Sequence, residues 1–112
     1  MKVSYEGIGQ LCASFACSTE LSEGALVKVS ANGTVSACAA DEELCGVVAA
    51  VSHDGKGCSV QLGGLVTAKF SGTAPTVGYG KLCADGAFGV KTGGSISRLI
   101  VAVDGTKVTF ML

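Results

Sequence analysis

LCGVVAAVSHDGKGCSVQL, residues 44–62, is the stretch that decides the fold, because it spells a complete β-hairpin. Apolar arms over residues 45–51 and 58–62 flank the polar segment His53-Asp54-Gly55-Lys56-Gly57. Glycine takes positive φ without steric cost, and aspartate hydrogen-bonds its own backbone, so the chain is expected to reverse there. The stretch therefore predicts two antiparallel strands joined by a polar turn.

The same pattern returns later in the chain. An apolar arm, the turn Asp104-Gly105 and an alternating arm make up residues 99–110. A second hairpin, residues 25–38 around Asn32-Gly33, recurs at residues 80–90 around Asp85-Gly86. At an offset of 53 positions Lys28 falls on Lys81, Ala31 on Ala84 and Gly33 on Gly86, and at an offset of 50 Asp54-Gly55 falls on Asp104-Gly105. We predict two diverged copies of a two-hairpin unit, residues 24–62 and 78–112; the alternative is chance similarity between glycine-rich hairpins.

The remaining segments complete an all-β prediction. Residues 11–17 alternate in hydropathy within an N-terminal strand region, 1–18, and residues 65–71 alternate as a strand that links the two repeats. Seventeen glycines mark many turns, the single proline marks a loop at 72–77, and no segment has a helical period. We expect one domain, residues 1–112, with little or no helix, folded as a small β-barrel or β-sandwich.

Composition limits the partners. Charged residues are 15% of the chain, so more apolar surface exists than one small core covers, and contact with another copy or another protein is expected. A net charge of −1 and few aromatic residues argue against nucleic-acid binding. No apolar run is long enough to span a bilayer and residues 1–6 lack a signal-peptide pattern, so we expect no membrane partner and synthesis in a reducing cytoplasm.

The six cysteines give no metal motif. They include no Cys-x-x-Cys pair, whereas a zinc site needs closely paired ligands that converge on one ion. Buried free thiols are the main expectation, since a reduced cysteine inside a strand behaves as a small hydrophobe. A disulfide and a metal site remain the alternatives. The cysteines are Cys12, Cys17, Cys38, Cys45, Cys58 and Cys83.

No catalytic, cofactor or metal residue is predicted. The only histidine, His53, lies in a turn, and the carboxylates cluster in connectors and turns, away from apolar strands that would raise a pKa. The triplet Asp41-Glu42-Glu43 could bind a hard cation but is more typical of a solvated loop. Gly78-Tyr79-Gly80 precedes no helix and is not a phosphate loop. Asn32-Gly33-Thr34 spells a glycosylation acceptor, although the turn is the simpler interpretation.

The order of turns and strands resembles a known family. The stretches that carry the resemblance are Gly24-x-Leu26-Val27-Lys28, Asn32-Gly33-x-Val35, Cys45-Gly46-Val47-Val48, Asp54-Gly55 and Val60-x-Leu62-x-Gly64. Over roughly residues 20–112 the chain is similar to the small capsid decoration (head-stabilising, cement) proteins of tailed phages and prophages. The resemblance implies a non-enzymatic β protein on the outer surface of the virion capsid, bound to the major capsid protein, often as a homotrimer. It implies no contact residues.

Two other function classes stay open. A carbohydrate- or cell-wall-binding module, for example of a tail fibre or a bacterial surface, would need exposed aromatic platforms, and Tyr5, Tyr79 and Phe88 could serve. A small thiol enzyme would need an exposed cysteine with a lowered pKa.

Overall fold

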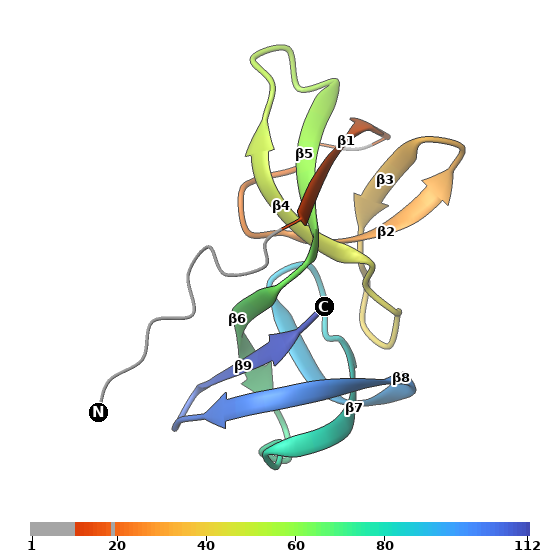
Figure 1. The fold of residues 1–112 in the computed structure, drawn as a ribbon. Helices are drawn as coiled ribbons and strands as arrows, with labels where there is room; N and C mark the ends of the chain where they lie inside the picture. Colours follow the sequence, from red (N-terminus) through yellow and green to blue (C-terminus); the bar gives the residue numbers. More distant parts are fainter. Residues whose placement is uncertain (1–10, 19) are drawn as a thin grey trace.

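The chain folds as nine β-strands that form two stacked halves (Figure 1). The structure is a computed structural model that describes residues 11–18 and 20–112. These residues contain no helix, so the expected all-β barrel class is confirmed. The part of the N-terminal strand region before Leu11 lies outside the described residues. The strands are β1 (Leu11–Cys17), β2 (Leu26–Ala31), β3 (Thr34–Ala37), β4 (Gly46–Val51), β5 (Gly57–Gly63), β6 (Leu65–Ser71), β7 (Gly78–Ala84), β8 (Gly89–Val103) and β9 (Lys107–Met111).

The first half, residues 11–63, is a closed barrel with the strand order β1-β3-β2-β4-β5. Both expected hairpins are present: β2 and β3 meet at Asn32-Gly33, and β4 and β5 are joined by residues 52–56. Gly33 has a φ of 63°, a left-handed conformation that explains why glycine stands at this turn.

The second half, residues 65–112, has the strand order β6-β9-β8-β7, and β6 also pairs with the start of β8. β8 bends in its middle, where Gly93 and Gly94 have φ values of 146° and 83°. Its first part pairs with β6 and β7, and its second part pairs with β7 and β9. These pairings also close a ring.

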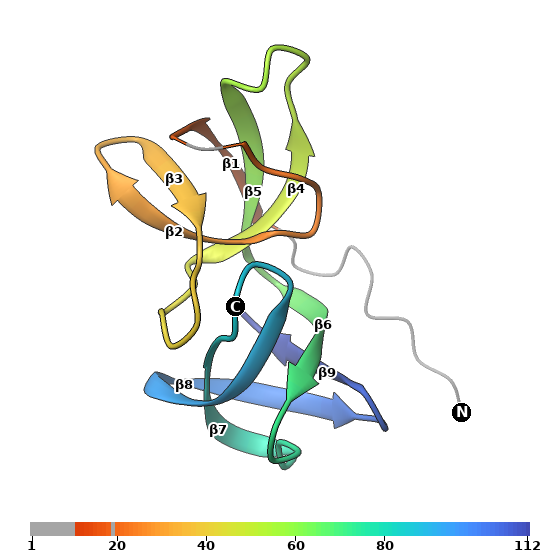
Figure 2. The same ribbon diagram turned by 180° about the vertical axis from the view of Figure 1, so that it is seen from behind.

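The two halves, seen from behind in Figure 2, have corresponding strand pairings. β1 pairs antiparallel with β5 and parallel with β3, as β6 does with β9 and with the first part of β8. A register shift separates Val48 from Ala50 in β4, and one at the matching place separates Ile100 from Ala102 in β8. Each structural unit therefore includes the strand in front of the predicted two-hairpin repeat.

One part of the predicted alignment is wrong by two residues. In the β2–β3 ladder Val29 lies opposite Val35, and in the matching ladder of β7 and β8 Ala84 lies opposite Val90. Ala84 therefore matches Val29, not Ala31. The offset of 53 holds only where these strands meet β4 and the second part of β8, since Leu26 opposes Val47 as Tyr79 opposes Leu99. β7 thus carries two residues more than β2.

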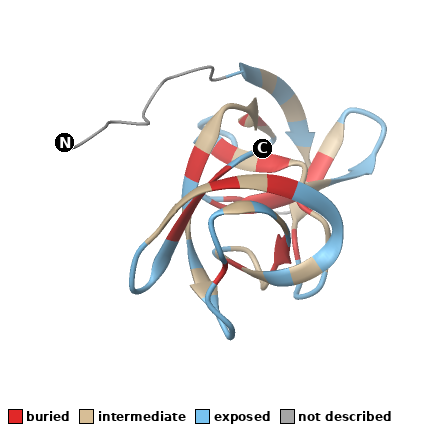
Figure 3. Cartoon of the chain, turned by 60° about the horizontal axis from the view of Figure 1, so that its bottom comes forward, coloured by how far each residue is buried: buried red, intermediate tan, exposed pale blue. Residues whose placement is uncertain are grey.

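Two clusters of buried side chains form the core. Turns and hairpin tips are exposed (Figure 3). One cluster fills the first half and centres on Val27, Val35 and Val60. The other fills the second half around Leu82 and Phe110 and also contains first-half residues. Those first-half members are Leu26, Cys38 and Leu44. The second cluster therefore joins the two halves.

Candidate interaction surface

A groove with a volume of about 510 Å³ lies between the halves. Its lining from the first half is Gly24, Leu26 and Val47, and its lining from the second half is Thr67, Ala68, Lys69, Phe88 and Lys107. Phe88 is 59% exposed at this groove. The groove combines an apolar lining with two cations, which suits contact with another macromolecule.

Lys69 and Lys107 lie directly opposite each other on β6 and β9. Both side chains are exposed, and neither forms an ion pair with another residue in the described part of the chain. Like charges in this cross-strand position repel, so an acidic group placed between them would be favourable. Their pairing depends on the register of two strands far apart in sequence, and for this reason the sequence did not reveal it.

Backbone hydrogen bonds hold the two sides of the groove together. The Leu26 amide donates to the Ala87 carbonyl at 2.6 Å. The Ala84 amide donates to the Glu42 carbonyl, and the Asp41 amide donates to the Ala84 carbonyl, both at 2.9 Å. The connector between β3 and β4 thus continues the sheet of the second half.

The acidic triplet connects the halves and is not gathered at one point. Asp41 forms an ion pair with Lys91, and Glu42 forms one with Lys28. Hydrogen bonding to Lys28 lowers the pKa of the Glu42 carboxyl. No group of three potential ligands close enough to hold a metal ion is present among the described residues.

Glu43 crosses to the second half. Its Oε1 accepts a hydrogen bond from the Ser95 amide at 2.8 Å, and its buried Oε2 has no hydrogen-bond partner among the described residues. This position of the Glu43 side chain requires a glycine at position 94, because a Cβ there would lie 2.1 Å from Glu43 Oε1 and 2.9 Å from the Cβ of Cys83. Gly94 therefore lets the connector and β8 meet.

Arg98 is the second polar link between the halves and was not singled out by the sequence. It is 7% exposed, and its Nη2 donates to the Leu44 carbonyl at 2.8 Å. Burial lowers the pKa of its guanidinium, and the nearby Glu43 carboxylate opposes this effect. An arginine at a buried position of an alternating strand is unexpected from hydropathy alone.

His53 and Asp54 lie in the β4–β5 turn, at the end of the molecule away from the second half (Figure 1). The Asp54 carboxylate accepts hydrogen bonds from Ser52 Oγ at 2.7 Å and from the Lys56 amide at 3.0 Å. These bonds lower the pKa of the Asp54 carboxyl. Both residues act as a turn here, and His53 is exposed.

All six cysteines are free thiols. Burial raises the pKa of Cys38 and of Cys58 from 9.0 to about 11, and it also raises the pKa of Cys45 and of Cys83. A raised pKa suppresses the thiolate, which is the nucleophilic form. These four side chains behave as small hydrophobes in the core.

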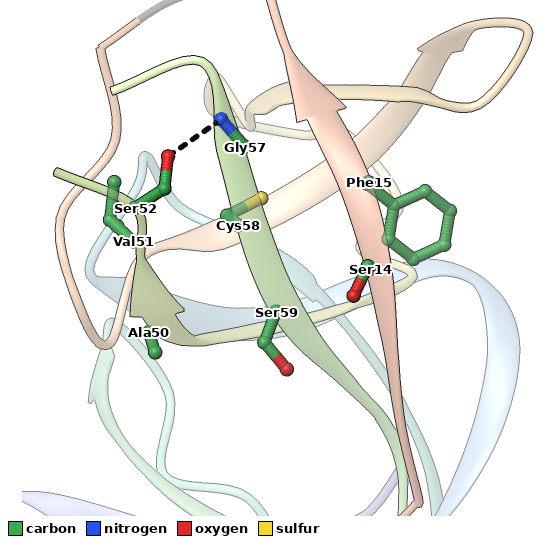
Figure 4. A pocket seen from close by; sticks show the side chains of 8 residues that line it. All are labelled: Ser14, Phe15, Ala50, Val51, Ser52, Gly57, Cys58 and Ser59. Carbon is green, nitrogen blue, oxygen red and sulfur yellow. Dashed lines mark hydrogen bonds between the residues drawn. The ribbon is translucent and has the colours of Figure 1, made fainter. Parts of the chain in front are cut away.

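A depression of about 370 Å³ lies on the first half (Figure 4). Small side chains and the ring of Phe15 line it. The Gly57 amide donates a hydrogen bond to Ser52 Oγ at 3.1 Å. The only titratable group in its lining is Cys58, whose pKa is raised to about 11. The residues that line it are Ser14, Phe15, Ala50, Val51, Ser52, Gly57, Cys58 and Ser59.

The aromatic residues considered for sugar binding lie apart from one another. Tyr79 is on β7 and is 80% exposed, beside a cleft of about 300 Å³, whereas Phe88 is at the groove between the halves. Tyr5 lies outside the described residues. Gly78-Tyr79-Gly80 lies within β7, so it forms strand and not a loop.

None of the described segments is a helix that could cross a membrane. Comparison with protein families, with curated proteins and with solved structures finds no match to the chain.

Proposed function

We propose that the chain is a non-enzymatic structural protein that binds the outer surface of an assembled phage or prophage head and stabilises it. Its partner is the major capsid protein, and it acts as a homo-oligomer, with a trimer favoured. It is made in the cytoplasm of the bacterial host and ends on the virion surface. The proposal joins the resemblance in turn-and-strand order to the character of the groove.

The groove is the observation that carries the proposal. Phe88 offers an exposed aromatic side chain beside Lys69 and Lys107, and neither lysine forms an ion pair with another described residue. A surface of this kind fits an apolar segment with a neighbouring carboxylate. Many copies bound to a repeating lattice would add weak individual contacts through avidity, so a shallow site is sufficient.

Co-sedimentation with capsids tests this proposal. The chain is mixed with empty heads assembled from the major capsid protein of the phage or prophage that encodes it, and the mixture is separated on a sucrose gradient. We expect saturable binding that falls at least about tenfold in affinity for Phe88→Ser. Met111→Ser changes an exposed apolar residue outside the groove lining and serves as the control. Absence of the wild-type chain from the capsid fractions would refute the proposal.

A carbohydrate-binding module is the second candidate, and the exposure of Tyr79 and Phe88 favours it. Exposed aromatic rings stack on sugar rings, which gives such modules most of their affinity. A glycan array probed with the labelled chain separates the two functions. Selective binding that Tyr79→Ala or Phe88→Ala abolishes would support the carbohydrate module, and a blank array would remove it.

A further inference from the structure

The contact between the halves is a template for a second contact. In the first half the backbone of Leu26 is bonded on the edge of β2: its amide donates to Ala87 of the second half at 2.6 Å, and its carbonyl accepts from the Cys38 amide at 2.9 Å. The side chains of Leu26 and Leu44 are 1% and 2% exposed, and both belong to the cluster that joins the halves. At Leu26 this edge of β2 is thus closed by Ala87 of the second half together with Cys38 of the first.

The matching residues of the second half are uncovered. Tyr79 corresponds to Leu26, because Tyr79 opposes Leu99 as Leu26 opposes Val47. Ile96 corresponds to Leu44, since each stands three residues before that opposing residue. Tyr79 is 80% exposed and Ile96 is 43% exposed. Two apolar side chains that the first half buries against its neighbour are therefore in solvent in the second half.

The edge of β7 is also unpaired at this place. Residues 78–81 pair along one edge with residues 97–100 of β8. Because β7 is two residues longer than β2, its pairing with the first part of β8 begins only at residue 82 and covers residues 82–84. Residues 78–81 make no backbone hydrogen bond to any described residue outside that pairing. Beside them lies the cleft of about 300 Å³, bordered by residues 73–77. An unpaired strand edge next to exposed apolar side chains is a template for another chain.

We infer that the edge of β7, with Tyr79 and Ile96, binds the first half of a second copy of this chain, as β2 with Leu26 and Leu44 binds the second half within one chain. The receiving surface is the one that corresponds to β6 and the turn 85–88, namely β1 and the turn 30–33 of the second copy. Both parts of that surface hold exposed residues, among them Ala16, Asn32 and Gly33.

Charge supports the choice of a second copy. Residues 11–63 hold six carboxylates and two lysines, whereas residues 65–112 hold two carboxylates, four lysines and one arginine. The first half is therefore acidic and the second half basic. Contact between the second half of one copy and the first half of the next places halves of opposite net charge side by side, which favours this orientation over contact between like halves. β1 and the turn 30–33 hold no charged residue themselves, so the attraction acts over a longer range.

Such a contact is heterologous, so it repeats from copy to copy and forms a ring where the rotation between copies closes. A ring of three copies would hold six halves in which first and second halves alternate. The contact between copies lacks some links present within the chain, because Asp41, Glu42 and Glu43 belong to a connector that is longer than its counterpart at residues 93–96. We therefore expect reversible association that depends on concentration.

Sedimentation velocity on the full chain, over a concentration series in reducing buffer and without capsids, tests the inference. The mean mass should rise with concentration to that of one closed oligomer. Tyr79→Ser and Ile96→Ser should each raise the self-dissociation constant at least about tenfold. Added salt should weaken association, because it screens the opposite charges. Circular dichroism confirms that each variant is folded, as expected for exposed positions.

Met111→Ser is the matched control, since Met111 is 43% exposed like Ile96 and lies on β9, outside the proposed contact. A monomeric wild-type chain at the highest concentration would overturn the inference. So would Tyr79→Ser and Ile96→Ser variants that associate normally, or a Met111→Ser variant that is weakened equally. The inference rests on the part of the proposed function that concerns self-association, and it specifies the surfaces involved. It does not depend on binding to the capsid, which Phe88→Ser tests separately.

Discussion

The two halves of the molecule share a pattern of strand pairing but differ in what they leave exposed. β2 of the first half is bonded along both edges near Leu26, whereas β7 of the second half is open near Tyr79. The β-bulges at Val48/Ala50 and Ile100/Ala102 occupy the same place in both. The comparison shows that the shared fold depends on strand register and on the position of the bulges. The places where one half exposes residues that the other half buries are the surfaces available for partners.

The largest difference between the cores lies at one matched position. Phe110 of the second half and Val60 of the first are both fully buried, and each opposes a matching residue of β6 or β1. Phe110→Ala should reduce the free energy of unfolding by about 3–5 kcal/mol, and Val60→Ala by about 2 kcal/mol, because a larger cavity remains after loss of a ring. Urea denaturation followed by circular dichroism measures both. A greater loss for Val60→Ala would contradict the comparison.

The next largest effect is expected at Gly46, where the backbone of β4 approaches β5 closely. Gly46 opposes Val27 in the first half, and Gly80 opposes Arg98 at the matching pair, so the small residue changes strand. A Cβ at Gly46 would lie 2.3 Å from the Gln61 carbonyl oxygen and 2.7 Å from Val60 Cγ1. Gly46→Ala should therefore destabilise the protein by about 1–3 kcal/mol in urea denaturation.

Gly105→Ala is the control for that substitution. An added Cβ at Gly105 meets no atom within 4 Å, and its φ is not positive. Its effect should stay within about 0.5 kcal/mol. Equal losses for Gly46→Ala and Gly105→Ala would show that contact with β5 does not limit position 46.

The third prediction concerns pH. Cys58 of the first half matches Val108 of the second, and burial raises the pKa of the Cys58 thiol from 9.0 to about 11. Between pH 9 and pH 11 the Cys58 thiol is deprotonated in the unfolded chain but stays protonated in the folded chain. The contribution of Cys58 to the free energy of unfolding is therefore fully present below pH 9 and is lost as the pH rises towards 11. Cys58→Val introduces the residue type of the matching position in the second half. The fall in the free energy of unfolding between pH 9 and pH 11 should be smaller by about 1–2 kcal/mol in this variant. An unchanged pH profile of the unfolding midpoint would contradict the assignment.

The smallest expected effect concerns the lysines at the groove. Lys69 and Lys107 oppose each other in the second half, while Ala16 and Gly57 take these places in the first. Lys69→Glu should stabilise the fold by roughly 0.2–0.5 kcal/mol, because repulsion becomes attraction at an exposed pair. Thermal unfolding at low and high salt measures this gain, which salt should reduce. Lys56→Glu, in the β4–β5 turn, is the control and should not stabilise.

Much of the fold followed from local sequence signals. Asn32-Gly33 and Asp54-Gly55 located two hairpins, and the alternation of residues 65–71 gave β6 with its observed bounds. The middle of β8 was the main omission: no strand was predicted over residues 91–98, where the chain bends at Gly93 and Gly94 and the strand continues. The parallel pairings of β1 with β3 and of β6 with β8 join segments far apart in sequence, which no local pattern reveals.

The candidate surfaces followed less well. Tyr79 and Phe88 were named as aromatic candidates, but their exposure depends on where their strand and turn end up in the packed structure. Ile96, Arg98 and the pair Lys69–Lys107 were missed, because burial and cross-strand register assign their roles. Ile96 falls on the place of Leu44 only when the halves are aligned by their ladders, and the structure supplies that alignment.

The linker that joins the two halves in the chain consists of one residue, Gly64. Gly64 separates β5 from β6 with a φ of 90°, and its carbonyl accepts the Leu112 amide at 3.0 Å. Such a short, bonded joint leaves the halves little freedom to swing. If copies assemble by repeating the contact within the chain, this joint sets the curvature of the assembly, and an insertion beside Gly64 would change how many subunits complete the circle.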